Sequence, residues 1–260
     1  MMDAIVTAGG IPKPEEPLYP QTMGKSKSLL DVAGKPMIQW VLDALRGSAR
    51  IGRVVVVGLD ETSGVTCENK PLDFLPTRGD MLANIEAGAR WLIAQNPLAP
   101  HIFVASSDIP AITSAMVDWV LDAANDADCD FYYSVVDRTV MEQRFPGSRR
   151  SYVRLKDAEV CGADLNVIGA RAIVGGSENS LWQKVVEARK SAFKQAQLVG
   201  FDMLWLLLTR GATLEYAERE VSKRLGIKGR VLRCPYAEVG MDVDKPFQLE
   251  ILTKDLETHR

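Results

Sequence analysis

The chain has 260 residues, of which 47% are hydrophobic, so it is long enough to bury a large core in one α/β unit. Its formal net charge at pH 7 is -3, and its 31 basic and 34 acidic residues are scattered along the sequence rather than clustered. This balance excludes a nucleic-acid backbone as the main partner and favours small ligands.

The beginning of the chain and the cysteine content predict a cytoplasmic protein. Residues 1–6 lack the basic, apolar and cleavage-site features of a secretory signal peptide. The four cysteines lie far apart, without the C-x-x-C spacing of a structural zinc site. The longest apolar run, residues 203–208, is far too short to cross a bilayer. We therefore expect reduced thiols and no integral membrane segment.

In the first half of the chain, short apolar runs rich in β-branched residues alternate with segments of helical period. This alternation is typical of an α/β fold in which helices cover a mostly parallel sheet. The predicted strands are residues 4–8, 54–59, 102–105 and 131–136, and the predicted helices are residues 36–46, 84–94 and 114–124.

From residue 137 onward the pattern is less regular. We expect one domain over residues 1–260, in which residues 137–230 form an excursion that binds an acceptor or makes a homodimer contact. The predicted elements are a polar loop at 138–150, strands at 152–155 and 164–168 that can run antiparallel to the others, a long helical insert at 181–209, a last strand at 231–234 and a closing helix.

A glycine pair directly follows the first predicted strand. Because Gly9 and Gly10 have no Cβ, backbone N–H groups there can approach a phosphate closely, although a plain tight turn is the alternative. A proline-rich segment then leads to Lys25 and Lys27, which can meet phosphate charge, with a solvated side chain as the alternative for Lys25. The dinucleotide fingerprint and the P-loop are both absent, since neither glycine spacing is matched.

Two further segments supply carboxylates. Asp108 ends a buried strand, so its side chain should project from the edge of the sheet where open α/β folds bind ligands, and it suits Mg²⁺ there. The alternative is a turn aspartate. Asp242 and Asp244 are two residues apart, which puts both carboxylates on one side of an extended chain. We favour Asp242 as the second metal ligand, with Asp244 as another ligand or the N-cap of the closing helix.

Ala8-Gly9-Gly10, Lys27-Ser28-Leu29-Leu30 and the run 34–38 together resemble the N-terminal signature of the MobA-like NTP-transferases and sugar-phosphate nucleotidyltransferases. The resemblance implies a Rossmann-like, three-layer, GT-A-like fold. It implies that the glycine turn, with Ala8, Gly9 and Gly10, cradles the β- and γ-phosphates and that Lys27 contacts the α-phosphate. It also implies Asp108 as a Mg²⁺ ligand, completed by the acidic stretch 242–246, and Lys27 and Asp108 as the catalytic pair.

Two weaker resemblances concern the nucleobase and the acceptor. The run 78–84 is similar to the family's turn beneath the base, which implies contacts from Gly79 and Asn84, with Asp80 as a hydrogen-bonding group or a helix cap. The run 161–167 is similar to the start of the strand that faces the acceptor, which implies Asn166. Four arginines around the predicted loop are candidates to clamp an acceptor phosphate, with a solvated basic loop as the alternative: Arg138, Arg144, Arg149 and Arg150.

The expected function is a Mg²⁺-dependent transfer of a nucleoside monophosphate from an NTP to a small phosphorylated acceptor, with release of pyrophosphate. An acceptor phosphate is already an anion at neutral pH, so no general base is required. One alternative is a nucleotide-sugar glycosyltransferase, because residues 242–244 form a D-x-D triplet. Another is a non-catalytic nucleotide-binding protein, because the third glycine and the arginine usual in the family's loop are absent. The sequence determines neither the base nor the acceptor.

Overall fold

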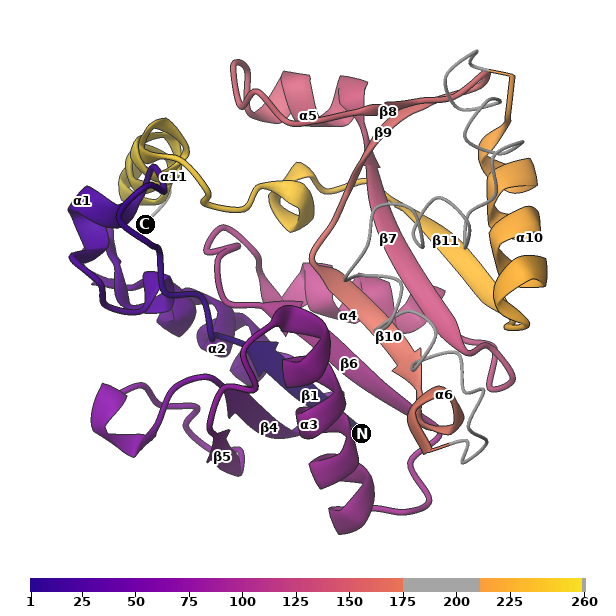
Figure 1. The fold of residues 1–260 in the computed structure, drawn as a ribbon, viewed down its shortest axis with the longest axis horizontal. Coiled ribbons are helices and arrows are strands. Elements are labelled where there is room, and N and C mark those ends of the chain that lie inside the picture. The colour runs from indigo at the N-terminus through magenta and orange to yellow at the C-terminus, as the bar shows by residue number, and fades with distance from the viewer. Residues whose placement is uncertain (175–210, 259–260) are drawn as a thin grey trace.

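The computed structural model describes residues 1–174 and 211–258, so the predicted helical insert at 181–209 lies outside the described residues. The described residues form a nine-stranded sheet in which eight strands follow the order β5-β4-β1-β6-β10-β7-β9-β8, and β11 pairs with β7 (Figure 1). A small separate ribbon pairs β2 (Asp31–Val32) with β3 (Lys35–Pro36).

The half of the sheet built by the first hundred residues is parallel. The central strand β1 (Met2–Thr7) lies between β4 (Ile51–Val57) and β6 (His101–Ser106), and it is parallel to both. Strand β5 (Leu72–Leu75) extends this half beyond β4. The first three strands were predicted, whereas β5 was not, because its four residues are only partly buried and form no apolar run.

The other half of the sheet is mixed. Strand β10 (Leu165–Gly169) runs antiparallel to both of its neighbours, β6 and β7 (Phe131–Asp137). Strand β11 (Gly229–Cys234) is parallel to β7. The short strands β9 (Glu159–Gly162) and β8 (Val153–Arg154) continue the sheet in antiparallel fashion. Because β10 is reversed, its first residues meet the carboxyl end of β6.

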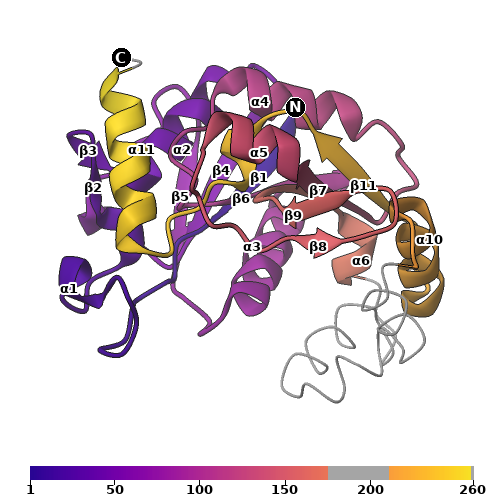
Figure 2. The ribbon, with the colours of Figure 1, turned by 90° about the horizontal axis from the view of Figure 1, so that it is seen from above.

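Helices cover both faces of the sheet, as Figure 2 shows. Successive residues of β1 alternate between two cores: Ala4 and Val6 pack into one, and Ile5 packs into the other, all fully buried. The predicted three-layer α/β architecture is therefore confirmed. The first core includes residues of α2 (Met37–Gly47), α4 (Ser114–Ala123) and α11 (Pro246–Thr258), and the second includes residues of α3 (Met81–Gln95) and α6 (Ala170–Val174).

Helices α5 (Arg138–Arg144) and α10 (Leu214–Leu225) lie where the sequence did not predict a helix. The expected polar loop at 138–150 begins with helix α5, so that prediction was wrong for its first half. The helix forms because Met141 is fully buried in the first core, which a reading of the charged residues alone overlooks. Helix α10 is capped by Thr213, whose side chain accepts a hydrogen bond from the N–H of Tyr216, and the helix packs on β11.

In the described part of the chain, no helix combines the length and apolar character needed to cross a membrane. All four cysteines are buried and unpaired.

Candidate active site

The loop after β1 is held by a segment that follows it about twenty residues later in the chain. The carbonyl oxygen of Ala8 accepts hydrogen bonds from the hydroxyls of Ser26, at 3.2 Å, and Ser28, at 3.3 Å. The carbonyl oxygen of Gly10 accepts one from the N–H of Lys27 at 2.8 Å. These bonds place the short 3₁₀ helix Lys27–Leu29 across the end of β1, so Lys27 reaches the carboxyl edge of the sheet.

Close backbone packing explains why Gly9 is a glycine. A Cβ on Gly9 would lie 2.6 Å from Nδ2 of Asn84 and 2.7 Å from Oγ1 of Thr77. On the other side, Gly58 has a φ of +116°, and a Cβ there would lie 2.4 Å from Cα of Gly9. Gly10 has more room, since the nearest atom to its Cβ position would be Cε of Lys27 at 3.9 Å. The loop is thus wedged tightly between its neighbours at Gly9 and open at Gly10.

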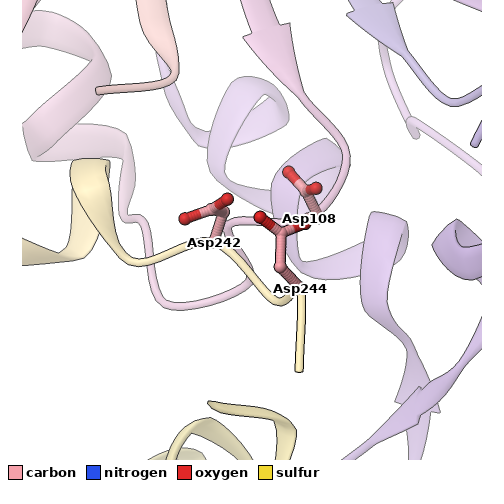
Figure 3. A group of neighbouring side chains, drawn as sticks. All are labelled: Asp108, Asp242 and Asp244. Carbon is pink, nitrogen blue, oxygen red and sulfur yellow. The ribbon is translucent and has the colours of Figure 1, made fainter. Parts of the chain in front are cut away.

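Three carboxylates gather at the same edge of the sheet. Asp108 lies in the turn after β6, and its carbonyl oxygen accepts a hydrogen bond of 3.0 Å from the N–H of Val243. Val243 is fully buried, so Asp242 and Asp244 on either side of it share one face of the chain. Ligand oxygens of the three aspartates all lie within 4.8 Å of one another (Figure 3). The sequence favoured Asp242 over Asp244, and the structure brings both to Asp108.

The carboxylate of Asp244 points into this cluster (Figure 3), and the side chain of Gln248 holds the backbone just before the closing helix. Oε1 of Gln248 accepts hydrogen bonds from the N–H groups of Asp244 and Lys245, both at 2.9 Å. Oδ1 of Asp244 instead lies 2.9 Å from Nζ of Lys27. The carboxylate of Asp244 is thus engaged by Lys27, and its role as a metal ligand stays a prediction.

Lys27 joins the glycine loop to the acidic cluster. Its Nζ lies 2.6 Å from Oδ2 of Asp108 as well as 2.9 Å from Oδ1 of Asp244. Burial would lower the pKa of Lys27, but the charges and hydrogen bonds of the two carboxylates outweigh it and raise the pKa above its ordinary value. The ammonium is therefore fully charged at neutral pH, which suits contact with a phosphate.

Asp164 is a fourth carboxylate at this edge, and no sequence pattern predicted its role. Its N–H donates to the carbonyl of Val239 at 2.9 Å, and its own carbonyl accepts from the N–H of Ser106 at 3.1 Å. Burial, and then the charge of Asp108, raise the pKa of Asp164 to about 7. The sequence does show that Asp164 comes just before a predicted strand. Its position at the site, however, depends on β10 being antiparallel, which the sequence left open.

One of the four candidate arginines enters the site. Arg150 forms an ion pair with Asp242, and its side chain is only 15% exposed. The other three are engaged elsewhere: Arg138 pairs with Glu159, Arg144 pairs with Glu238 and Asp255, and the guanidinium of Arg149 lies 5.3 Å from the ring centroid of Phe247.

A cavity of about 540 Å³ opens beside the acidic cluster. Asp164, Asn166 and Asp242 line it together with Arg150, and side chains of α3, β7 and α10 supply much of the apolar remainder. The amide of Asn166 also holds the backbone, since Oδ1 accepts from the N–H of Ser134 and Nδ2 donates to the carbonyl of Ala163.

The turn before α3 is braced by the residues that the sequence singled out. Oδ1 of Asn84, which is buried, accepts a hydrogen bond of 2.6 Å from the N–H of Arg78. Gly79 has a φ of +96°, a conformation that favours glycine. Asp80 caps the helix, because its carboxylate accepts from the N–H of Ala83. Lys25 is exposed in the turn that follows Thr22.

The charges of the site are unbalanced. Within the described residues, four carboxylates meet two cations at this edge: Asp108, Asp164, Asp242 and Asp244 against Lys27 and Arg150. A divalent cation would compensate the two excess negative charges when all four carboxylates are ionised. Their oxygens are the hard ligands that Mg²⁺ prefers, so the donor set fits this ion.

An edge that combines exposed backbone amides, one ammonium and several carboxylates is suited to a triphosphate and its metal ion. Together with this sheet order, it defines the class of the protein, which is a nucleotidyltransferase. The chain belongs to the family of the MobA-like NTP transferase domain, whose family model matches residues 4–200. The resemblance drawn from the glycine turn and Lys27 is thereby confirmed.

Solved structures agree with this assignment. A hypothetical transferase from Thermus thermophilus is 32% identical, with a TM-score of 0.79, and the match covers 95% of this chain and 99% of that one. CMP:2-keto-3-deoxy-manno-octonic acid synthetase, complexed with CTP, shares the fold at 16% identity and a TM-score of 0.62, over 100% of both chains. The 2-C-methyl-D-erythritol 4-phosphate cytidylyltransferase of Thermus thermophilus also shares the fold, at 15% identity and a TM-score of 0.54. This match covers 99% of this chain and 100% of that one.

Proposed function

We propose that this protein transfers a nucleoside monophosphate from an NTP to a small phosphorylated acceptor, using Mg²⁺ and releasing pyrophosphate. The observation that carries the proposal is the contact of Lys27 with both Asp108 and Asp244 beside the glycine loop. It brings a fixed positive charge and the candidate metal ligands to the place where the α-phosphate of a triphosphate held by the loop would lie.

Each part of the site has a distinct task in this reaction. Backbone N–H groups around Ala8, Gly9 and Gly10 hold the β- and γ-phosphates. Lys27 stabilises the negative charge that develops around the α-phosphorus. Asp108, Asp242 and Asp244 would hold Mg²⁺, which when bound neutralises phosphate charge and orients the triphosphate.

The chemical step forms one bond and breaks one. An acceptor phosphate oxygen bonds to the α-phosphorus, and the bond from that phosphorus to the oxygen bridging to the β-phosphorus breaks, with the electron pair leaving on pyrophosphate. The acceptor oxygen carries no proton that must be removed, so the rate depends on alignment and charge stabilisation. The absence of histidine from the described site residues is compatible with this chemistry.

We infer that residues 137–230 supply the acceptor side of a single catalytic domain. The cavity beside the acidic cluster supports this, because Arg150, Asp164 and Asn166 line it and come from this part of the chain. Gly79 and Asn84, from the turn before α3, are proposed to lie under the nucleobase, and Lys25 to reach the triphosphate. The cytidylyltransferases of the same fold make CTP the first donor to test.

The test is the melting temperature of the protein with ATP, GTP, CTP and UTP, each with and without Mg²⁺, followed by pyrophosphate release across a panel of phosphorylated acceptors. A ligand that binds only the folded state raises the melting temperature by mass action. We expect a Mg²⁺-dependent rise for one base, and we expect Asp108→Asn to abolish it. Asp122→Asn is the matched control, since that carboxylate is exposed and pairs with Arg50 on the surface.

Three outcomes would contradict the proposal in different ways. A nucleoside diphosphate sugar that raises the melting temperature when no NTP does would favour the glycosyltransferase alternative. Tight NTP binding without pyrophosphate release over the whole panel would favour a nucleotide-binding protein without catalysis. A Mg²⁺-dependent rise that survives in Asp108→Asn would remove Asp108 from the metal site.

A further inference from the structure

No ligand contact has yet been assigned to Arg150, in contrast to Lys27 and the three aspartates. Its guanidinium is largely buried, and its one ion-pair partner among the described residues is Asp242. Nε of Arg150 is buried and donates no hydrogen bond to the described part of the protein. An arginine offers five N–H donors in a rigid fork, which is more than the carboxylate of Asp242 and the nearby thiol of Cys161 can satisfy. The fork therefore has donors left for a ligand.

Arg150 lines the cavity beside the acidic cluster, so a ligand in that cavity can reach its free donors. Arg150 is the one basic side chain among the described residues that line the cavity beside the acidic cluster, whereas Asp130, Asp164 and Asp242 are acidic. Its positive charge also acts on the cavity residues Tyr133 and Asp164, which lie within its electrostatic reach. An anion that enters this cavity would be repelled by every other charged group in the described lining.

Asp242 is shared between two neighbours. It pairs with Arg150, and its carboxylate also belongs to the cluster formed with Asp108 and Asp244. A carboxylate that ligates a divalent cation has less negative charge to offer a guanidinium. Occupation of the cluster by Mg²⁺ would therefore weaken the ion pair and free donors of Arg150 for another anion.

We propose that Arg150 binds the phosphate group of the acceptor, and that Mg²⁺ in the acidic cluster releases the guanidinium from Asp242 for this purpose. This inference rests on the proposed function. It identifies the acceptor as an anion that the planar guanidinium of Arg150 binds through two hydrogen bonds. It predicts positive coupling between two ligands, since each makes the protein bind the other more tightly.

The experiment measures the affinity for inorganic phosphate, followed by melting temperature at constant ionic strength, with and without Mg²⁺. We expect Mg²⁺ to strengthen phosphate binding roughly tenfold in the natural protein, within the usual range of coupling between two sites. In Arg150→Met the coupling should disappear, and phosphate affinity with Mg²⁺ should fall on the order of tenfold. Arg149→Met is the matched control, because it removes the same charge from the neighbouring residue and should leave the coupling intact.

Arg150→Lys keeps the charge without the fork, and it serves as a second variant if Arg150→Met fails to fold because Asp242 is left unpaired. We expect several-fold weaker phosphate binding in this variant, together with a normal Mg²⁺-dependent response to the NTP. Equal phosphate affinity in the natural protein and in both Arg150 variants would overturn the inference, and so would the absence of coupling in the natural protein. Failure of the proposed function is separate, since it appears as a missing NTP response in the natural protein itself.

Discussion

Nζ of Lys27 lies 2.6 Å from Oδ2 of Asp108, although one residue follows β1 and the other follows β6. The contact exists because Ser28 bridges the two loops: its hydroxyl lies 2.7 Å from that of Ser107 and also donates to the carbonyl of Ala8. The ammonium group of Lys27 thus contacts a carboxylate that a metal ion at this site would also bind. Removal of this lysine should therefore have opposite effects on metal binding and on turnover.

We expect Lys27→Met to lower turnover on the order of 100-fold, because it removes a principal electrostatic stabiliser of the reacting phosphate. The same variant should bind Mg²⁺ more tightly, since Asp108 and Asp244 lose their competing cation. Steady-state kinetics and the Mg²⁺ dependence of the melting temperature measure the two effects. Lys25→Met, at an exposed position, is the control for the metal measurement. Weaker Mg²⁺ binding in Lys27→Met would show that the lysine assists the metal rather than competing with it.

The two glycines of the loop should respond differently to alanine. In Gly9→Ala the new Cβ would lie 2.6 Å from Nδ2 of Asn84, so either the loop or the turn before α3 must move. We expect a loss of about 1–3 kcal/mol in the free energy of unfolding, as for other overpacked sites. In Gly10→Ala the new Cβ would meet no atom closer than 3.9 Å, so the free energy of unfolding should stay within about 0.5 kcal/mol of that of the natural protein. Urea denaturation of both variants measures this contrast, and equal losses would refute it.

Asp164 predicts a pH dependence of stability. Burial, and then the charge of Asp108, raise its pKa in the folded protein to about 7 from an ordinary value of 3.8. Between these values the folded state binds more protons than the unfolded state, so the carboxyl makes folding less favourable as the pH rises toward 7. Asp164→Asn removes this penalty, and its stability relative to the natural protein should be higher at pH 8 than at pH 5. Denaturant unfolding without metal at the two pH values measures the difference, and the opposite order would contradict the assignment.

The cysteines predict a folded protein without a reactive thiol. Burial raises the pKa of all four, and it raises the pKa of Cys234 to about 11. The thiolate is the reactive form, so a disulfide reagent at pH 8 should modify the native protein slowly and all four cysteines rapidly after unfolding. Because the unfolded thiols ionise first, these groups should also lower stability as the pH rises above about 9. A thiol that reacts rapidly in the native protein would contradict this picture.

The parts of the site that the sequence predicts are those that follow parallel strands directly. Asp108 lies two residues after β6, and Gly9 lies two residues after β1, so an apolar run and the residues after it were sufficient to place them at one edge. Asp242 and Asp244 could also be predicted to lie on one side of the chain, because the alternation of side chains along an extended chain requires only local geometry. The family resemblance then supplied Lys27, whose position depends on hydrogen bonds that no local pattern encodes.

Asp164 and Arg150 could not be selected in the same way. Asp164 reaches the cluster because β10 is antiparallel and begins beside the end of β6, a fact of sheet topology rather than of local pattern. Arg150 was one of four arginines in a polar segment, and only tertiary contacts distinguish it from Arg144, which pairs with Glu238 and Asp255. The contacts proposed for Gly79, Asn84 and Asn166 with ligands stay predictions.

The hydrogen bond from the N–H of Lys27 to the carbonyl of Gly10 closes the base of the intervening stretch, residues 11–26. Residues beyond that closure are joined to the site through two fixed ends, and the entropy of closing such a loop grows only slowly with its length. Changes of length in residues 11–17, which precede the buried Leu18 and Thr22 and the anchoring Ser26, should therefore leave the ammonium group of Lys27 in place. The length of this outer segment and the position of the charged group can thus change independently of each other.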